Sequence, residues 1–280
     1  MSWDVTSAVL FAAALHAAWN ALVRADPDPV RGTARVVIGA AIAAAPVLAF
    51  LPLPAPASWP YLAASAAVHV GYFVLVALAY RSGDLSLVYP LMRGGAPLLT
   101  ALVAATILGE PLNGGGWVGV LLIGGGVLLM ASDARAGRGA GSRPVVLALL
   151  TAGVVALYTV VDGLGARRSG TPLSYTGWML VLTALALAPV VRAAAPSPVT
   201  PAGPGALRLG LVGGACTFGS YAIALWAMTR APIPLVAALR ETSVVFATLI
   251  AALLLRERVS RVRWAAVGVI AVGTIAIKLS

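Results

Sequence analysis

Stretches of about 20 apolar residues recur along the chain, separated by short polar breaks. About 20 apolar residues are needed for one helix to cross the hydrocarbon core of a bilayer. Only 10% of the residues are charged, whereas about 25% are charged in a typical soluble domain. The chain therefore has too few charges to cover a water-facing surface, and we expect a polytopic membrane protein.

The apolar stretches predict ten transmembrane helices, with expected ranges 5–23, 34–52, 59–80, 86–108, 115–131, 145–164, 173–191, 207–228, 233–255 and 262–279. The longest polar stretch, Ser132–Arg143, divides the chain into two halves of five spans each. We therefore expect an all-α protein with a first repeat over 1–138 and a second over 139–280. The first apolar stretch is expected to be a span and not a secretory signal. The residues before it include Asp4 but no Lys or Arg, whereas a signal peptide begins with a positively charged region.

The two halves resemble each other in sequence. Arg93 and Arg240 lie 147 positions apart (240 − 93), each inside an apolar span. The same offset matches Leu108 with Leu255, Glu110 with Glu257, Trp117 with Trp264 and Gly126 with Gly273. Because five is an odd number of spans, the second half must enter the membrane in the opposite sense. Inverted repeats are an architecture of transporters, which bind substrate near the midplane where the repeats meet.

Basic residues in the connections are unevenly distributed between the two sides. One side holds thirteen: Arg24, Arg31, Arg35, Arg81, Arg135, Arg138, Arg143, Arg192, Arg208, Arg256, Arg258, Arg261 and Arg263. The other holds four: Arg167, Arg168, Arg230 and Lys278. The positive-inside rule places the richer side in the cytoplasm and both termini outside, in a cell (plasma or inner) membrane. The net charge of +10 is thereby accounted for, and no nucleic-acid partner is expected.

Three segments, Tyr89–Met130, Pro234–Ile277 and His16–Arg24, resemble the EamA-type family of the drug/metabolite transporter superfamily. The resemblance implies ten helices in two inverted halves and the transport of small organic solutes, often export. It also implies a central cavity lined by the first, third, fourth, sixth, eighth and ninth helices. The second copy departs from the family pattern, because Arg256 replaces the glycine that precedes the acidic residue in Gly109–Glu110.

Arg93 and Arg240 are the first candidates for a site. An arginine in hydrocarbon costs about 2.5 kcal/mol or more, so something must offset that cost. In one interpretation both guanidinium groups face the cavity and bind an anionic or zwitterionic solute, because their planar fork matches carboxylate or phosphate. In the other they form structural ion pairs, such as Arg240 with Glu241 or Arg93 with Asp162.

Polar residues four apart share one face of a helix. His16 and Asn20 form such a pair on the first span, and Tyr158 and Asp162 form one on the sixth. They are expected to line the cavity, with His16 or Asp162 carrying a coupling proton. The alternative is helix–helix hydrogen bonding, worth about 0.6 kcal/mol per contact. Glu241 cannot share the face of its neighbour Arg240, so it is expected to pair elsewhere or to carry a proton.

Further candidates are aromatic or small residues. His69 and Tyr72 are expected to face the cavity together, and Tyr89, Tyr221 and Trp226 are expected to stack on the solute. No metal site or cofactor is expected, because the two histidines lack a Cys or carboxylate at ligand spacing. Glycines predict that the fifth and tenth spans pack closely, against each other or in a homodimer: Gly115, Gly119, Gly124, Gly126, Gly268 and Gly273.

The expected function is secondary-active transport of a small polar, anionic or zwitterionic metabolite by alternating access, as an exporter or exchanger. No motif of nucleotide hydrolysis is present, so a proton gradient or solute exchange would supply the energy. Three alternatives stay open. They are a lipid or lipid-phosphate flippase of the same fold, an intramembrane enzyme and a non-transporting scaffold.

Overall fold

The computed structural model describes residues 1–280 except 25–28, 83–84, 136–141, 195–202, 255 and 257–258. Every regular element within the described residues is a helix. In chain order these are α1 (Trp3–Arg24), α2 (Pro29–Leu48), η1 (Pro56–Ser58), α3 (Trp59–Ser82), α4 (Leu85–Thr106), α5 (Gly114–Arg135), α6 (Ser142–Arg168), α7 (Pro172–Ala194), α8 (Pro204–Met228), α9 (Ile233–Arg240), α10 (Ser243–Leu249), η2 (Ile250–Leu254) and α11 (Arg261–Leu279).

The helices follow the predicted spans to within a few residues. Seven described segments are long and apolar enough to cross a membrane: Trp3–Leu22, Pro56–Val76, Ser142–Arg168, Pro172–Val190, Gly205–Met228, Ile233–Leu254 and Arg261–Leu279. Two shorter apolar helices, Gly32–Leu48 and Gly114–Met130, accompany them. The expected all-α, multi-span architecture is confirmed. The predicted second span reaches too far, because α2 ends at Leu48 and closely spaced prolines follow, whose nitrogens cannot donate to a helix.

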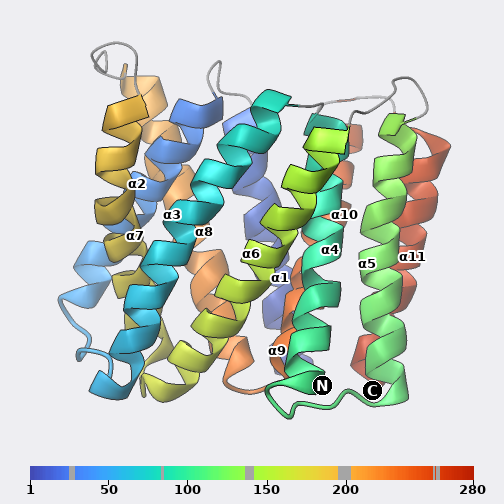
Figure 1. Ribbon diagram of the computed structural model, residues 1–280, viewed down its shortest axis with the longest axis horizontal. Coiled ribbons are helices and arrows are strands. Elements are labelled where there is room, and N and C mark those ends of the chain that lie inside the picture. Colours follow the sequence, from blue (N-terminus) through green and yellow to red (C-terminus); the bar gives the residue numbers. More distant parts are fainter. Residues whose placement is uncertain (25–28, 83–84, 136–141, 195–202, 255, 257–258) are drawn as a thin grey trace.

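The two halves run through the bundle in opposite senses. In Figure 1, α1 rises from the end where both termini lie, whereas α6, the first helix of the second half, descends toward that end. We call this end the terminal face; it also carries the connections 49–58, 107–113, 169–171 and 229–232. An odd number of spans per half predicts this inversion.

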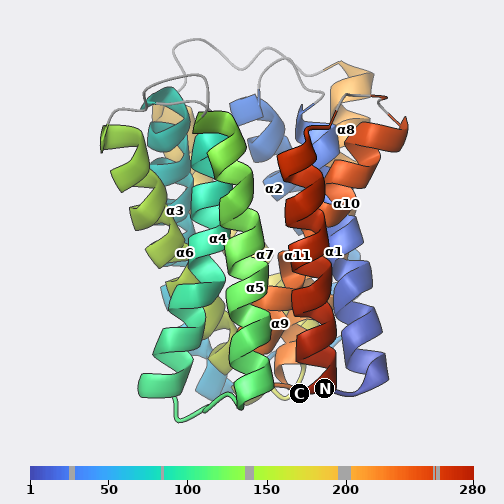
Figure 2. The same ribbon diagram turned by 90° about the vertical axis from the view of Figure 1, so that its right-hand side faces the viewer.

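Glycines bring helices into backbone contact at several crossings, and two of these crossings join helices of different repeats. Where α2 crosses α8, a Cβ added to Gly39 would lie 2.1 Å from the carbonyl oxygen of Gly210. Where α5 lies along α11, a Cβ added to Gly119 would lie 2.9 Å from the oxygen of Gly273. Figure 2 shows α5 and α11 side by side. The prediction that these two spans pack closely is therefore confirmed within one chain, and a homodimer through them stays a prediction.

Gly39→Ala is expected to lower the melting temperature of the purified protein. The added methyl group would meet backbone atoms of α8, which cannot rotate away as a side chain can. Overpacking of this kind costs about 1–3 kcal/mol or more. Gly71→Ala in α3 is the matched control, because nothing lies within 4 Å of its added Cβ. An unchanged or raised melting temperature for Gly39→Ala would contradict the close crossing of α2 and α8.

The ninth predicted span is not one regular helix, as 233–255 implied, but α9, α10 and the π-helical η2 in series. Between α9 and α10 the backbone tightens, with Glu241 and Thr242 donating to carbonyls three residues back, at 2.9 and 3.1 Å. The Thr242 hydroxyl also donates to the Leu239 oxygen, at 2.7 Å. A hydroxyl that competes for a helix carbonyl favours such irregularity. Short 3₁₀ and π segments within a helix often mark hinges or functional sites.

Equivalent residues of the two repeats adopt the left-handed conformation after α4 and after η2. Gly109 has φ of +66°, and Arg256, 147 positions later, has φ of +52°. After α4 the Glu110 N–H donates to the Ala104 oxygen, six residues back, at 3.0 Å, so the left-handed turn at Gly109 folds the chain back onto the last turn of the helix. Arg256 therefore keeps the left-handed conformation although it is not a glycine. This conformation is expected to cost about 1–2 kcal/mol of folding free energy for a residue with a side chain.

Candidate functional site

A buried ion pair joins the two repeats in the middle of the bundle. Arg93 Nε of α4 lies 2.9 Å from Glu241 Oε2, at the end of α9. The two residues are only 6% and 4% exposed. Glu241 can reach α4 because it points away from the face of Arg240, about 100° around the helix. The two ion pairs weighed from the sequence, Arg240 with Glu241 and Arg93 with Asp162, are not the ones formed.

Arg240 is the second buried guanidinium, and its environment differs from that of Arg93. It is 8% exposed and lies over the ring of Tyr221, with Cζ 4.9 Å from the ring centre. Within the part of the chain that the structure describes, no carboxylate oxygen lies within 4.0 Å of it. Two guanidinium groups and one carboxylate leave a net charge of +1 in this region.

Residues from six helices surround these charges. His16 of α1, Tyr72 of α3 and Tyr158 of α6 each lie within electrostatic range of both guanidinium groups. The ring of His69 stacks on that of Tyr158 at 4.4 Å, and Tyr72 meets the same ring edge-on at 5.6 Å. We call this set the central cluster, and its members are His16, His69, Tyr72, Arg93, Tyr158, Tyr221, Arg240 and Glu241. They come from α1, α3, α4, α6, α8 and the α9–α10 junction.

A buried carboxylate adjoins the central cluster. Asp162 of α6 is 0% exposed, and its two oxygens accept hydrogen bonds from Tyr221 at 2.5 Å and Tyr175 at 3.3 Å. Ser65 and His69 of α3 also interact with it. No Lys or Arg nitrogen among the described residues lies within 4.0 Å of this carboxylate. Tyr221 thus contacts Asp162 with its hydroxyl and Arg240 with its ring.

The remaining predicted site residues have different surroundings. Trp19 Nε1 donates to His16 Nδ1 at 3.2 Å, and the Asn20 amide donates to the His16 carbonyl at 2.7 Å, within the same helix. Trp226 lies near the terminal face, where Arg230 stands over its ring at 5.4 Å. The side chain of Tyr89 and the whole of Glu257 lie outside the described residues. Across the described ranges, no three His, Cys, Asp or Glu residues are grouped as metal ligands would be.

Two contributors to the site, Ser65 and Tyr175, were not predicted. Both are fully buried, at 0% exposure, beside Asp162. Ser65 lies four residues before His69 on α3, and its hydroxyl lies 3.2 Å from His69 Nδ1. This spacing was a usable signal. Tyr175 follows Asp162 across the short α6–α7 connection, a contact that no helical spacing predicts.

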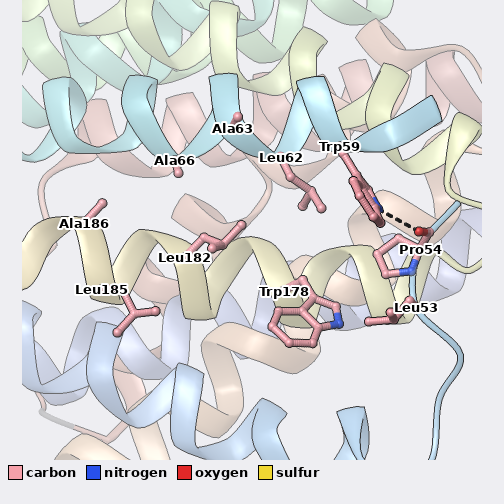
Figure 3. A pocket seen from close by; sticks show the side chains of 10 residues that line it. All are labelled: Leu53, Pro54, Trp59, Leu62, Ala63, Ala66, Trp178, Leu182, Leu185 and Ala186. Carbon is pink, nitrogen blue, oxygen red and sulfur yellow. Dashed lines mark hydrogen bonds between the residues drawn. The ribbon is translucent and has the colours of Figure 1, made fainter. Parts of the chain in front are cut away.

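An apolar cavity of about 640 Å³ lies apart from the central cluster, between α3 and α7. Figure 3 shows the side chains that line it: Leu53, Pro54, Trp59, Leu62, Ala63, Ala66, Trp178, Leu182, Leu185 and Ala186. None of these side chains is charged, and the Trp59 indole N–H already donates to the Pro54 carbonyl at 2.9 Å. The lining is therefore suited to hydrocarbon and carries no side chain of opposite charge for a charged group.

An all-helical bundle of inverted halves, with charges gathered where the halves meet, has the architecture of a membrane transporter. The chain belongs to the EamA-like transporter family, which matches it twice, over residues 4–132 and 142–279. No curated protein matches the sequence. A solved structure called only "Crystal structure of protein" is similar in fold, with a TM-score of 0.78, 22% identity, and coverage of 99% of this chain and 98% of that one.

Proposed function

We propose that this multi-pass membrane protein is a ten-helix secondary transporter that moves a small anionic or zwitterionic metabolite by alternating access. The observation that carries the proposal is Arg240, a buried guanidinium over Tyr221 without a carboxylate partner in the described chain. A buried charge without a partner is strongly unfavourable, so a negative group on the solute would supply what the protein lacks. Intramembrane charges mark solute or ion pathways in many transporters.

The chemistry around Arg240 supports a small solute that carries a carboxylate or phosphate. The guanidinium can hold such a group through two parallel hydrogen bonds. The hydroxyls of Tyr72 and Tyr158 and the imidazole of His69 lie in the same cluster and can bond the polar remainder of the solute. Glu241 could meet an ammonium group of a zwitterion, at the expense of its pair with Arg93.

Asp162 is the coupling site that we favour among the three predicted candidates. Its carboxylate is buried, no Lys or Arg of the described chain lies within 4.0 Å of it, and a proton would neutralise it. Tyr221 connects it to Arg240, so protonation can alter the position of the ring beneath the guanidinium. His16 is less suited, because its Nδ1 accepts from Trp19, and Glu241 is less suited because its charge balances Arg93.

A flippase for lipid or lipid phosphate is the second candidate, and the cavity between α3 and α7 is the observation that favours it. That cavity opens beside α7, where Leu185 is exposed, and it is deep enough to reach the buried Leu62. A lipid headgroup would nevertheless have to cross a lining without charged side chains. We therefore prefer a soluble metabolite as the solute. The proposed orientation, with both termini outside a cell membrane, rests on the distribution of loop arginines, and the proposed direction is export or exchange. An intramembrane enzyme or a scaffold has no comparable observation in its favour.

A thermal-shift screen of the purified protein tests this proposal. Anionic and zwitterionic metabolites are expected to raise the melting temperature, whereas cationic and neutral compounds of matched size are not. A ligand at 100 times its Kd stabilises by about 2.7 kcal/mol, which is a readily measured shift. Stabilisation by cations alone, or by lysophospholipids alone, would contradict the proposal, and the latter would favour the flippase.

The same screen at two pH values tests the coupling. The shift produced by an anionic hit is expected to depend on pH in the unmodified protein and to lose that dependence in Asp162→Asn. Groups that face Asp162 and stay in place in the variant are Tyr175, Tyr221, Ser65 and His69. A pH dependence that is unchanged in Asp162→Asn would remove this carboxylate from the coupling.

A further inference from the structure

Arg167 and Glu110 tie two connections to the end of α6 at the terminal face. The Arg167 guanidinium, at the end of α6, donates from Nε to the Met228 oxygen at 2.7 Å and from Nη2 to the Ala231 oxygen at 3.0 Å. Its Nη1 is paired with Glu110 Oε1. The other oxygen of Glu110 accepts from the Ile233 N–H, the first of α9, at 3.0 Å. Two side chains thus close four contacts among the 107–113 connection, α6 and the segment between α8 and α9.

Glu110 is held in this position by the end of α4. Gly109 takes the left-handed conformation, and the Glu110 N–H is bonded to the Ala104 oxygen. The carboxylate, which belongs to the first repeat, then reaches the start of α9 in the second. An acidic group at a helix N-terminus is favourable, because it pairs with N–H groups that have no partner in the helix.

We propose that Glu110 and Arg167 form a latch that keeps the terminal face closed and that opens when solute crosses this face. The inference rests on the proposed transport function and adds the residues that control one of its two openings. Directly beneath the latch, Ile233 and Met228 are both 0% exposed, and Ile233 packs against Gly163 of α6. These side chains separate the terminal face from the central cluster, which begins two turns further along α9 at Arg240.

The exposure of the latch fits a contact that opens and closes. The side chains of Arg167 and Glu110 are 31% and 16% exposed, so water reaches them and can replace their bonds. Arg93 and Glu241, by contrast, are almost wholly buried. The latch and this inner ion pair act on the same two helices, because α4 carries Arg93 and leads into Glu110, and α9 begins at Ile233 and ends at Arg240.

The test measures how fast a water-soluble maleimide reaches Met228→Cys in a Cys216→Ser background, which leaves one cysteine in the chain. Glu110→Gln and Arg167→Gln are each expected to raise the labelling rate about tenfold or more, since hydrogen bonds to charged groups contribute about 1.5–3 kcal/mol. Arg168→Gln is the matched control, because Arg168 stands over Tyr61 at 4.8 Å and belongs to no latch contact. Its labelling rate is expected to stay at that of the parent.

The outcomes separate the latch from the transport proposal. Labelling needs no solute, so it is informative even if the thermal-shift screen yields no anionic hit. Equal labelling rates in Glu110→Gln, Arg167→Gln and the parent would overturn the latch, and so would an equal increase in Arg168→Gln. Melting curves of each variant verify that the bundle is intact, and a second reporter, Ile233→Cys, replaces Met228→Cys if the latter fails to fold.

Discussion

Arg240→Gln is expected to abolish the stabilisation of the protein by anionic metabolites while leaving its own melting temperature unchanged or higher. Glutamine keeps hydrogen-bond donors but loses the positive charge and the fork that binds carboxylate or phosphate. The lost charge-assisted bonds correspond to roughly 10- to 100-fold weaker binding. Folding is spared because Arg240 has no carboxylate partner in the described part of the chain, so no buried negative charge is left behind.

Arg230→Gln is the matched control for this variant. Arg230 also lies over an aromatic ring, that of Trp226, but it is exposed at the terminal face. In the same melting assay, the Arg230→Gln protein is expected to be stabilised by the same anions as strongly as the unmodified protein. Full retention of anion binding by Arg240→Gln would remove this residue from the site and leave the proposed solute class without its main support.

Arg93→Met is expected to have the largest effect on stability. Its removal leaves Glu241 buried without the guanidinium at 2.9 Å, and breaking such a pair costs about 3–5 kcal/mol. The double variant Arg93→Met/Glu241→Leu is expected to recover most of the loss, because apolar side chains of similar volume often replace a buried ion pair at little cost. Melting temperatures of the two single variants and the double variant, in one detergent, measure this non-additivity.

Arg240→Met provides the comparison for the ion pair. It removes a guanidinium of similar burial that has only an aromatic contact, so its melting temperature is expected to stay well above that of Arg93→Met. Equal losses for these two single variants would show that Glu241 does not depend on Arg93. Strict additivity in the double variant would lead to the same conclusion.

The sequence was sufficient to predict the helices and their inverted arrangement, because bilayer thickness dictates the length of each apolar stretch. It was also sufficient to select the two buried arginines, whose cost in hydrocarbon demands a reason. The adjacency of Arg240 and Glu241 excluded a shared face, and the structure agrees, since Glu241 turns toward α4. The partner of Glu241 depends on how the two repeats pack against each other. The spacing of residues within one repeat does not predict that packing.

The irregular backbone was harder to predict than the spans. Nothing in the apolar stretch Ile233–Leu254 signals a tightened turn, because Thr242 is compatible with a regular helix and acts only once its hydroxyl bonds to Leu239. The latch was missed for a different reason. Arg167 was counted among the loop arginines that orient the protein, and Glu110 was noted only for its repetition. A charge near a helix end can satisfy several backbone groups at once, and that role appears only in three dimensions.

The glycine contacts restrict how the bundle can change shape. Gly39 on α2 meets Gly210 on α8, and Gly119 on α5 meets Gly273 on α11. Each of these contacts packs a helix of one repeat tightly against a helix of the other. Tightly packed interfaces of this kind shift between discrete arrangements and do not stretch. The rigid bodies of this protein should therefore be mixed, each drawing helices from both ancestral copies. Relative motion would then occur between groups of helices that each contain members of both repeats, and not between the first repeat and the second.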